Sequence, residues 1–210
     1  SLIAALHRAN QLGYPIMIIG AGLPKIYKML SDEKSYSERL FMYKKIDSLT
    51  DEQSEKAIEE PAKKFNIIYE ATNKIVEITK GYPFFIQQLC KIVYDKTNKD
   101  VIELSDVENC IDEFLSSLDE RFFKSRYERC AESDKKFIFA MVECGELPCT
   151  ISNVAHNLNK TVGSISTTRA QLISKGIIYP VRYKELDFTV PEFSGYIQRL
   201  EEYKQWCISK

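Results

Sequence analysis

A glycine and a proline separate two helical segments near the middle of the chain, and this helix–turn–helix pattern limits the folds that the chain can adopt. Apolar residues recur at helical spacing over residues 70–80 and again over residues 83–96, with Gly81 and Pro83 between them. Glycine suits the left-handed conformation that follows many helices, and proline suits the first helical position. We therefore predict two helices joined by a tight turn. The buried side chains of the second helix should be its apolar ones: Phe84, Ile86, Leu89, Ile92 and Val93.

Capping signals extend the helical region on both sides of this turn. Thr50 and Gln53 have the spacing of a capping box, in which two side chains bond the first free amides of a helix. Ser105 and Glu108 have the same spacing, and we expect them to open a long helix. Pro61 should kink or restart the first helix, because it lacks an amide proton. The region as a whole is predicted to be a small helical bundle.

The C-terminal part, residues 129–200, shows a different order of elements. Ser133 should cap a helix that follows it, and two further helical segments follow within residues 150–159 and 161–175. Two short alternating strands around a turn come next, within residues 177–190. Three helices followed by a hairpin is the order of a winged helix-turn-helix, so we predict that fold here.

The N-terminal part reads as a piece of an α/β unit. An apolar helical segment over residues 1–13 precedes the continuous apolar run Ile16 to Ile19, which is typical of a strand buried on both faces. The run ends in Gly20-Ala21-Gly22, but a P-loop would require Gly-Lys-Ser/Thr, and Lys25 stands without these neighbours. We expect a strand that ends in a turn, and not a phosphate site. Since one strand makes no sheet, we expect the chain to be a fragment whose apolar run is covered by another element or by a second copy.

Composition places the chain among ordinary globular proteins. Hydrophobic residues make up 44% and charged residues 28%, and no apolar run approaches the ~20 residues of a membrane span. The six cysteines form no CxxC pair, and two histidines give little support for a metal site, so no metal is expected. We expect a cytoplasmic protein with reduced thiols and no membrane contact.

Charge is segregated along the chain. Residues 46–120 contain 17 acidic and 8 basic side chains, whereas residues 147–184 contain no acid at all. The basic residues of the acid-free stretch are Lys160, Arg169, Lys175, Arg182 and Lys184. Such a stretch is either a polar surface that lacks acids by chance or a face that meets polyanions.

Several segments together resemble a known family. "LIAALHRANQLGYPIMIIGAGLP", "SYSERLF", "IEEPAKKF", "ITKGYPFFIQQL" and "LISKGIIYPVRYKELDFTVPEF" resemble the C-terminal two-thirds of prokaryotic AAA+/STAND-type ATPases, a group related to archaeal and bacterial origin-initiator ATPases. The resemblance implies a mostly α fold with a small β component. It divides the chain into the remnant of an α/β P-loop core (1–45), a helical lid (46–128), a winged helix-turn-helix (129–200) and a tail (201–210).

The resemblance also implies a nucleotide. The full-length protein should bind ATP or ADP with Mg²⁺ and should be an ATPase. The Walker A and Walker B segments of the family have no counterpart in these 210 residues. Because positioning and metal electrostatics supply most of phosphoryl-transfer catalysis, this chain alone should be inactive and should not bind nucleotide tightly.

Two candidate nucleotide contacts follow from the resemblance. Arg39, in "SERLF", matches the position of an arginine finger; the alternative is a surface arginine paired with Glu38. Gly81, Tyr82 and Pro83 match a lid motif that lies beside adenine; the alternative is ordinary helix punctuation.

The predicted winged helix offers the candidate DNA contacts. Short polar and basic side chains suit phosphate and base-edge contacts, and basic residues at a wing suit the DNA backbone. The candidates are Lys160, Thr161, Ser164, Ser166, Thr167, Arg169, Arg182 and Lys184. The alternative is a module that binds a protein partner.

Two functions remain open at this stage. The chain is either the lid and winged-helix portion of an AAA+/STAND-like ATP-binding protein, which couples nucleotide state to DNA or partner binding, or a stand-alone winged-helix transcriptional regulator with a helical dimerisation domain. Double-stranded DNA is the expected partner, and a protein partner or self-association through the exposed core remnant is the other expectation.

Overall fold

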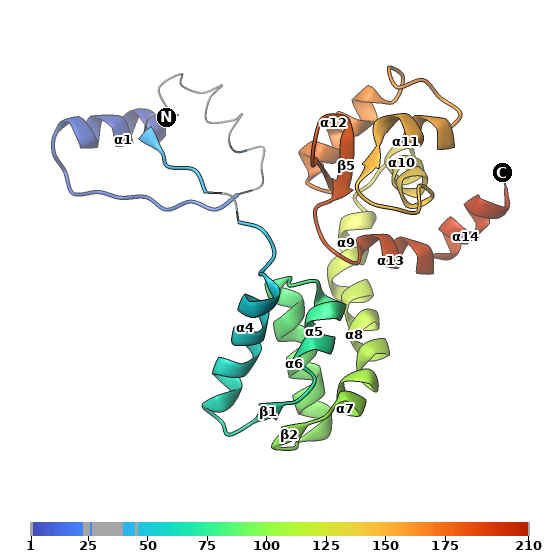
Figure 1. The fold of residues 1–210 in the computed structure, drawn as a ribbon. Helices are drawn as coiled ribbons and strands as arrows, with labels where there is room; N and C mark the ends of the chain where they lie inside the picture. The colour runs from blue at the N-terminus through green and yellow to red at the C-terminus, as the bar shows by residue number, and fades with distance from the viewer. Residues whose placement is uncertain (1, 23–25, 27–39, 45, 210) are drawn as a thin grey trace. The chain divides into compact units, whose positions relative to one another are not determined.

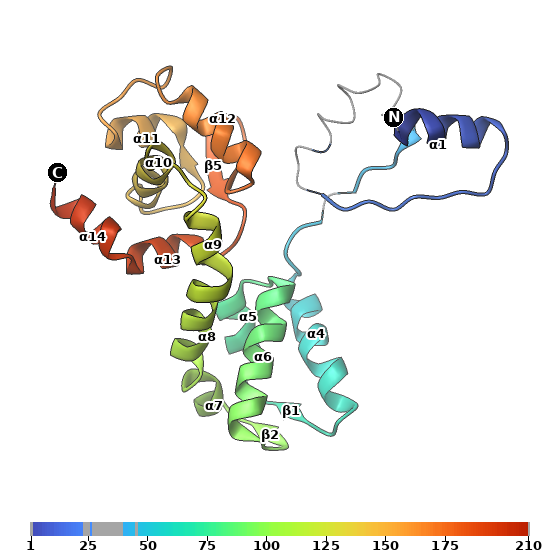
Figure 2. The same ribbon diagram turned by 180° about the vertical axis from the view of Figure 1, so that it is seen from behind.

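The computed structural model describes residues 2–22, 26, 40–44 and 46–209, and they are mostly helical with a small β component (Figures 1 and 2). This confirms the predicted fold class. Contacts between residues divide the chain into two units, Ser1–Ile46 and Asp47–Lys210. Each unit is described by itself.

The N-terminal unit contains helix α1 (Leu2–Gln11) and an extended segment. The predicted buried strand is wrong for the described residues: Ile16 to Ile19 form no strand and are 45–86% exposed. The physical reason is that an extended segment becomes a strand only when a neighbour pairs with its amides and carbonyls. No described residue of this unit supplies such a neighbour.

The first helix of the second unit is α4 (Asp51–Lys63), and its start was predicted correctly. The Thr50 hydroxyl accepts from the Gln53 amide at 3.3 Å, and the Gln53 side chain accepts from the Thr50 amide at 3.1 Å. The expected restart at Pro61 is wrong. Pro61 lies in the last turn of α4, and the helix ends two residues later as one element.

Helices α5 (Thr72–Thr79) and α6 (Pro83–Thr97) confirm the predicted turn between two helices. Lys80 and Gly81 both have left-handed backbone conformations, with φ of 51° and 67°. One part of the prediction is wrong: Phe84 is 46% exposed, and Phe85 is buried in its place. Both phenylalanines are apolar and adjacent, so hydrophobicity alone did not show which of them faces the core.

The third stretch of this helical region is broken, where one long helix was predicted. It consists of α7 (Leu104–Glu108), α8 (Ile111–Leu118), the π-helix η1 (Asp119–Phe123) and α9 (Lys124–Tyr127). The predicted capping box at Ser105 is wrong. The carboxylate of Asp106 instead accepts from the Glu103 amide at 3.0 Å, so the N-cap is Glu103 and α7 begins two residues earlier.

A short parallel pair of strands closes one end of the helical region, and the sequence patterns did not predict it. Strands β1 (Ile68–Tyr69) and β2 (Val101–Ile102) pair in register across the end of the helices. We call residues 47–128 the helical module and residues 129–210 the C-terminal module. Figures 1 and 2 show α8 and α9 running from the first module to the second.

The C-terminal module alternates helices with a small sheet. Its elements are α10 (Glu132–Val142), β3 (Cys149–Thr150), α11 (Ile151–Asn157), α12 (Ser166–Lys175), β4 (Ile178–Pro180), β5 (Glu185–Phe188), α13 (Phe193–Arg199) and α14 (Glu201–Ile208). The three strands are antiparallel in the order β3-β5-β4. Strand β3 was not predicted. Ser133 does not cap α10; Asp134 does, because its carboxylate accepts from the Ala131 amide at 3.0 Å.

One hydrophobic core continues through both modules, from Ile58 in α4 to Ile197 in α13. The ring of Phe123 lies between them, with its centroid 6.0 Å from that of Phe85 and 5.4 Å from that of Tyr196. No helix of the described chain is both long and apolar enough to cross a membrane.

Candidate nucleic-acid interface

Helix α12 and the turn before it are fixed to the core by their apolar side chains. Ile165 and Leu172 are buried, and Gly176 ends the helix in a left-handed conformation, as predicted. Thr167 lies on the opposite side of the helix and is exposed, whereas Arg169, four positions after Ile165 and three before Leu172, lies on the core side and is half-buried. This amphipathic arrangement presents short polar side chains on a rigid element.

The hydroxyl groups in the turn are engaged locally. Ser164 Oγ donates to the Thr161 carbonyl at 2.8 Å, and Ser166 Oγ donates to the Gly163 carbonyl at 2.7 Å. A hydroxyl has one proton, so these two serines do not also donate to a phosphate in this conformation. Thr161 Oγ1 accepts from the Ser164 amide at 3.3 Å. These three residues therefore stabilise the turn, and any contact with an anion would have to come from neighbouring residues.

Arg169 has the unusual environment among the candidates. Its Nε atom is buried and has no hydrogen-bond partner among the described residues. A guanidinium carries five N–H donors in a fixed plane, and an unpaired buried donor costs free energy.

Lys175, the fifth basic residue of the acid-free stretch, is neutralised within the fold. Its ammonium lies 2.5 Å from the Asp134 carboxylate and donates to the Arg129 carbonyl at 3.1 Å. Asp134 is fully buried at the start of α10, so this pair ties α12 to α10. The other four basic residues form no ion pair within the described part of the chain, and they are Lys160, Arg169, Arg182 and Lys184.

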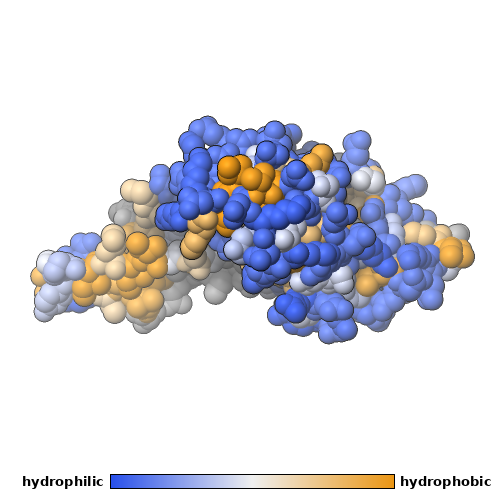
Figure 3. Space-filling view, turned by 90° about the horizontal axis from the view of Figure 1, so that it is seen from below, coloured by the Kyte–Doolittle hydropathy of each residue, from blue (hydrophilic) through white to orange (hydrophobic). Residues whose placement is uncertain are grey.

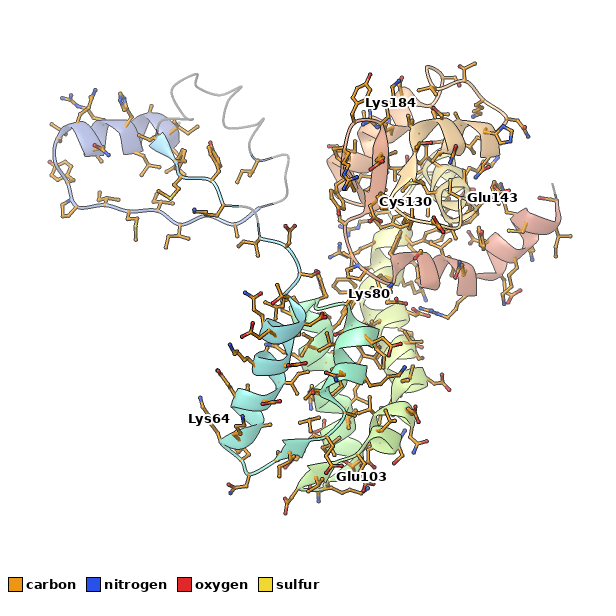
Figure 4. The ribbon with its side chains drawn as sticks, viewed as in Figure 1. Lys64, Lys80, Glu103, Cys130, Glu143 and Lys184 are labelled. Atoms are coloured by element: carbon orange, nitrogen blue, oxygen red, sulfur yellow. The ribbon has the colours of Figure 1, made fainter. Side chains whose placement is uncertain are left out.

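The β4–β5 turn carries the remaining basic candidates. The Glu185 amide donates to the Arg182 carbonyl at 3.1 Å, which closes a four-residue turn, and the Val181 amide donates to the Glu185 carbonyl at 3.2 Å. The Lys184 carbonyl accepts from the Ile151 amide at 2.9 Å, so the turn is also fixed to the start of α11. Figure 4 labels Lys184 at the end of the C-terminal module that lies away from the helical module.

One residue of this turn was missed from the sequence. Tyr183 is 87% exposed between Arg182 and Lys184, and the Lys184 ammonium lies 5.1 Å from its ring centroid. The signal was present in the sequence: an aromatic residue between two cations, within a hairpin turn, is a poor candidate for the core.

The residues matched to an adenine contact have local structural roles. A Cβ atom on Gly81 would lie 2.3 Å from the Leu49 carbonyl oxygen, so only glycine fits there. The Tyr82 ring packs 4.7 Å from that of Phe85, and Pro83 occupies the first turn of α6. The end of one helix, the start of the next and close packing account for the residue types at these three positions.

Two residues considered for contact with a phosphate fall outside the described part of the chain, and the described residues hold no metal-ligand cluster. Arg39 lies outside the described residues, as does Lys25. Within the described part of the chain, no group of three histidine, cysteine or acidic side chains is placed to hold a metal ion.

Two of the cysteines are poorly suited to act as nucleophiles. The six cysteines are free, and burial raises the pKa of both Cys90 and Cys149 to about 12. Because the thiolate is the reactive form, these two thiols are poor nucleophiles near neutral pH.

Comparisons with known proteins match the C-terminal module to a family model. The model describes a domain of unknown function (DUF8462) and matches residues 120–197, from η1 into α13. No curated protein matches the chain. Among solved structures, a mutant of RuvB from Thermotoga maritima is similar, at 16% identity and a TM-score of 0.37. That alignment covers 77% of this chain and 53% of the RuvB chain, and a TM-score this low does not establish a common fold.

Proposed function

We propose that this chain binds double-stranded DNA through its C-terminal module, as the lid and winged-helix portion of an AAA+/STAND-type ATP-binding protein. The observation that supports DNA binding most is the arrangement of α10, β3, α11, α12, β4 and β5 with the sheet order β3-β5-β4. This is the order of a winged helix, in which the second helix of the helix-turn-helix enters the major groove. In this chain that helix is α12, and the β4–β5 turn is the wing.

Charge supports the same proposal. Residues 147–184 contain no acid, and four of their basic residues form no ion pair within the described chain. The helical module, by contrast, is acidic. Cations that are unpaired within the protein are available to release counterions from DNA, which is the main source of binding free energy for such contacts.

The proposed coupling to nucleotide concerns the longer protein. The two modules share one core, and two ion pairs join them: Lys80 with Glu192 at 2.8 Å, and Arg199 with Asp119 at 2.6 Å. Figure 4 shows Lys80 where the two modules meet. A lid and a winged helix connected in this way would move together. Since the Walker A and Walker B segments of that family have no counterpart in these 210 residues, DNA binding by this chain should not change when ATP is added.

The alternative, a winged-helix regulator with a helical dimerisation domain, is favoured by one surface feature. Exposed apolar side chains gather around the β1–β2 pair, and they are Phe65, Ile68, Val101 and Leu104. Figure 3 shows an apolar patch bordered by hydrophilic residues at this end of the helical module. Contiguous exposed apolar surface of this kind often marks a protein interface. A solution mass equal to that of one chain at all protein concentrations would exclude dimerisation through this apolar surface.

The proposal is tested by titrating a labelled duplex with the whole chain at several salt concentrations. If four cations contact phosphates, the logarithm of the affinity should fall with the logarithm of the salt concentration with a slope of about −3 to −4. Arg182→Ala should weaken binding and reduce the slope by about 1. Lys63→Ala, on the exposed side of α4, is the matched control and should leave both unchanged. Absence of any salt-dependent affinity for duplex DNA would refute the proposal.

A further inference from the structure

The exposed ring of Tyr183 has no structural role that accounts for its position. The side chain is 87% exposed at the tip of the β4–β5 turn, and the core cluster does not include it. Scattered apolar side chains are common on surfaces, but tyrosine and tryptophan are enriched at interfaces, because each combines an apolar ring with a polar group. The Tyr183 ring is therefore available to a ligand.

The turn holds this ring in a defined place. Tyr183 is the second residue of a turn closed by the Glu185 amide and the Arg182 carbonyl, and Lys184 adopts a left-handed φ of 65°. The bond from the Ile151 amide to the Lys184 carbonyl fixes the turn to α11. A non-glycine residue in this conformation is strained, and such strain is retained where surrounding contacts enforce it. The aromatic ring is thus presented by a rigid backbone, which lowers the entropic cost of binding.

The chemistry of the tip matches a nucleotide. An aromatic face binds a nucleobase by stacking, and cations on either side bind the adjacent phosphates. Arg182 and Lys184 flank the ring in sequence, and the Lys184 ammonium lies close to it at 5.1 Å from the centroid. Inside an intact duplex the bases are paired and stacked on one another, whereas a base left unpaired at a junction can stack on a side chain without the cost of unpairing.

We propose that the β4–β5 tip binds an unpaired base of DNA by stacking on Tyr183, so that the chain prefers DNA with a duplex-to-single-strand junction over blunt duplex. The inference rests on the proposed function, because α12 holds the adjoining duplex while the tip contacts the open base. Tyr183 supplies the stacking surface, and Arg182 and Lys184 neutralise the flanking phosphates.

The test compares the whole chain and its variants on three probes: a blunt duplex, the same duplex with a forked end, and the single strand alone. The fork carries 2-aminopurine at its first unpaired position, because stacking changes the fluorescence of that base. Tyr183→Ala should lose about 5- to 150-fold in affinity for the fork, which is the range for one base–aromatic stack. Tyr183→Phe should keep the affinity, since it keeps the ring. Tyr94→Ala, which removes another exposed tyrosine in the helical module, is the matched control and should behave as the unaltered chain.

The outcomes separate the two proposals. Preference for the fork, a fluorescence change on binding, and loss of both in Tyr183→Ala but not in Tyr183→Phe would support the inference. Salt-dependent binding of blunt duplex with equal affinities for Tyr183→Ala and the unaltered chain on every probe would overturn the inference and leave the proposed function intact. Failure of the unaltered chain to bind any of the three probes would overturn both. Thermal melting of each variant should match the unaltered chain, because residue 183 lies outside the core.

Discussion

Replacement of Gly81 by alanine should destabilise the chain more than a glycine replacement usually does. Gly81 has a φ of 67°, which an L-residue adopts only with strain. An added Cβ atom would lie 2.3 Å from the Leu49 carbonyl oxygen and 3.3 Å from Ser54 Oγ. The carbonyl of Gly81 also accepts from the Leu49 amide at 2.9 Å. The backbone must therefore move, and the segment that leads into α4 must move with it.

The size of the effect follows from three contributions. The left-handed conformation costs an alanine about 1–2 kcal/mol. Loss or distortion of the hydrogen bond to the Leu49 amide costs about 1 kcal/mol. The backbone shift that separates the new Cβ atom from the Leu49 carbonyl has a further cost. We therefore expect a total loss of about 2–4 kcal/mol in the free energy of unfolding. For a chain of this length, that lowers the melting temperature by about 5–15 °C.

Two other glycines separate these contributions. Gly145 has a φ of 79°, but no atom lies within 4 Å of the position that an alanine Cβ would take, so Gly145→Ala should cost only the conformational strain, about 1–2 kcal/mol. Gly163 has neither feature, and Gly163→Ala should change stability by less than about 0.5 kcal/mol. Thermal melting followed by circular dichroism measures all three. A Gly81→Ala variant no less stable than Gly145→Ala would refute the close contact with Leu49 as the reason for a glycine at this position.

Two further predictions concern ion pairs. Hydrogen bonds from Lys99, and then from the Glu103 amide, lower the pKa of Asp106 in the folded chain. Because the folded pKa lies below the unfolded one, the ionised carboxylate stabilises the fold. This stabilisation is complete above about pH 4 and is lost as the pH falls through the folded pKa. Asp106→Asn should therefore lose less stability than the unaltered chain between neutral pH and pH ~3, measured by urea unfolding, and equal losses would contradict this. Arg199 donates through Nε and Nη2 to both carboxylate oxygens of Asp119, so Arg199→Ala should cost about 1 kcal/mol. Arg199→Lys should not restore the loss, because an ammonium cannot make the paired contact; full rescue in thermal melting would show that charge alone matters.

The helical elements were the most predictable part of the fold. Thr50, Gln53, Gly81 and Pro83 each act through local backbone chemistry, and local chemistry is visible in sequence. The π-helix η1 and the break before α8 were not visible. They depend on which side of a long apolar segment packs against other elements, and that is decided by the tertiary structure.

The caps at Glu103 and Asp134 show why a correct type of signal can select the wrong residue. Each prediction chose the serine nearest the expected start, at Ser105 and Ser133, because serine is a preferred N-cap residue. In both cases an aspartate at the third helical position instead reaches back to the amide that precedes the helix. Asp106 and Asp134 also bind Lys99 and Lys175, so contacts distant in sequence helped to decide the register.

The candidate interface was predicted as a list of polar residues, and the structure divides that list by role. Hydroxyl groups in the turn before α12 are used within the turn, and Lys175 is paired with Asp134. Composition could not distinguish a paired lysine from an unpaired one, because the partner is 41 positions away. Tyr183 was not among the candidates, because only polar and basic side chains were considered there, although its two charged neighbours indicated a surface position.

The apolar run Ile16 to Ile19 marks the limit of what periodicity can predict. Its composition indicated burial, and within the described chain it is exposed because burial requires a neighbour that composition does not specify. Covering a medium-sized apolar side chain is worth about 1.5–3 kcal/mol, so four largely exposed ones represent on the order of 5 kcal/mol of unrealised stabilisation. An extended backbone adds unpaired amides and carbonyls, which favour a strand as the cover. We propose that this run is a site of self-association or of contact with a further part of a longer protein, since either would supply the strand that the described residues lack.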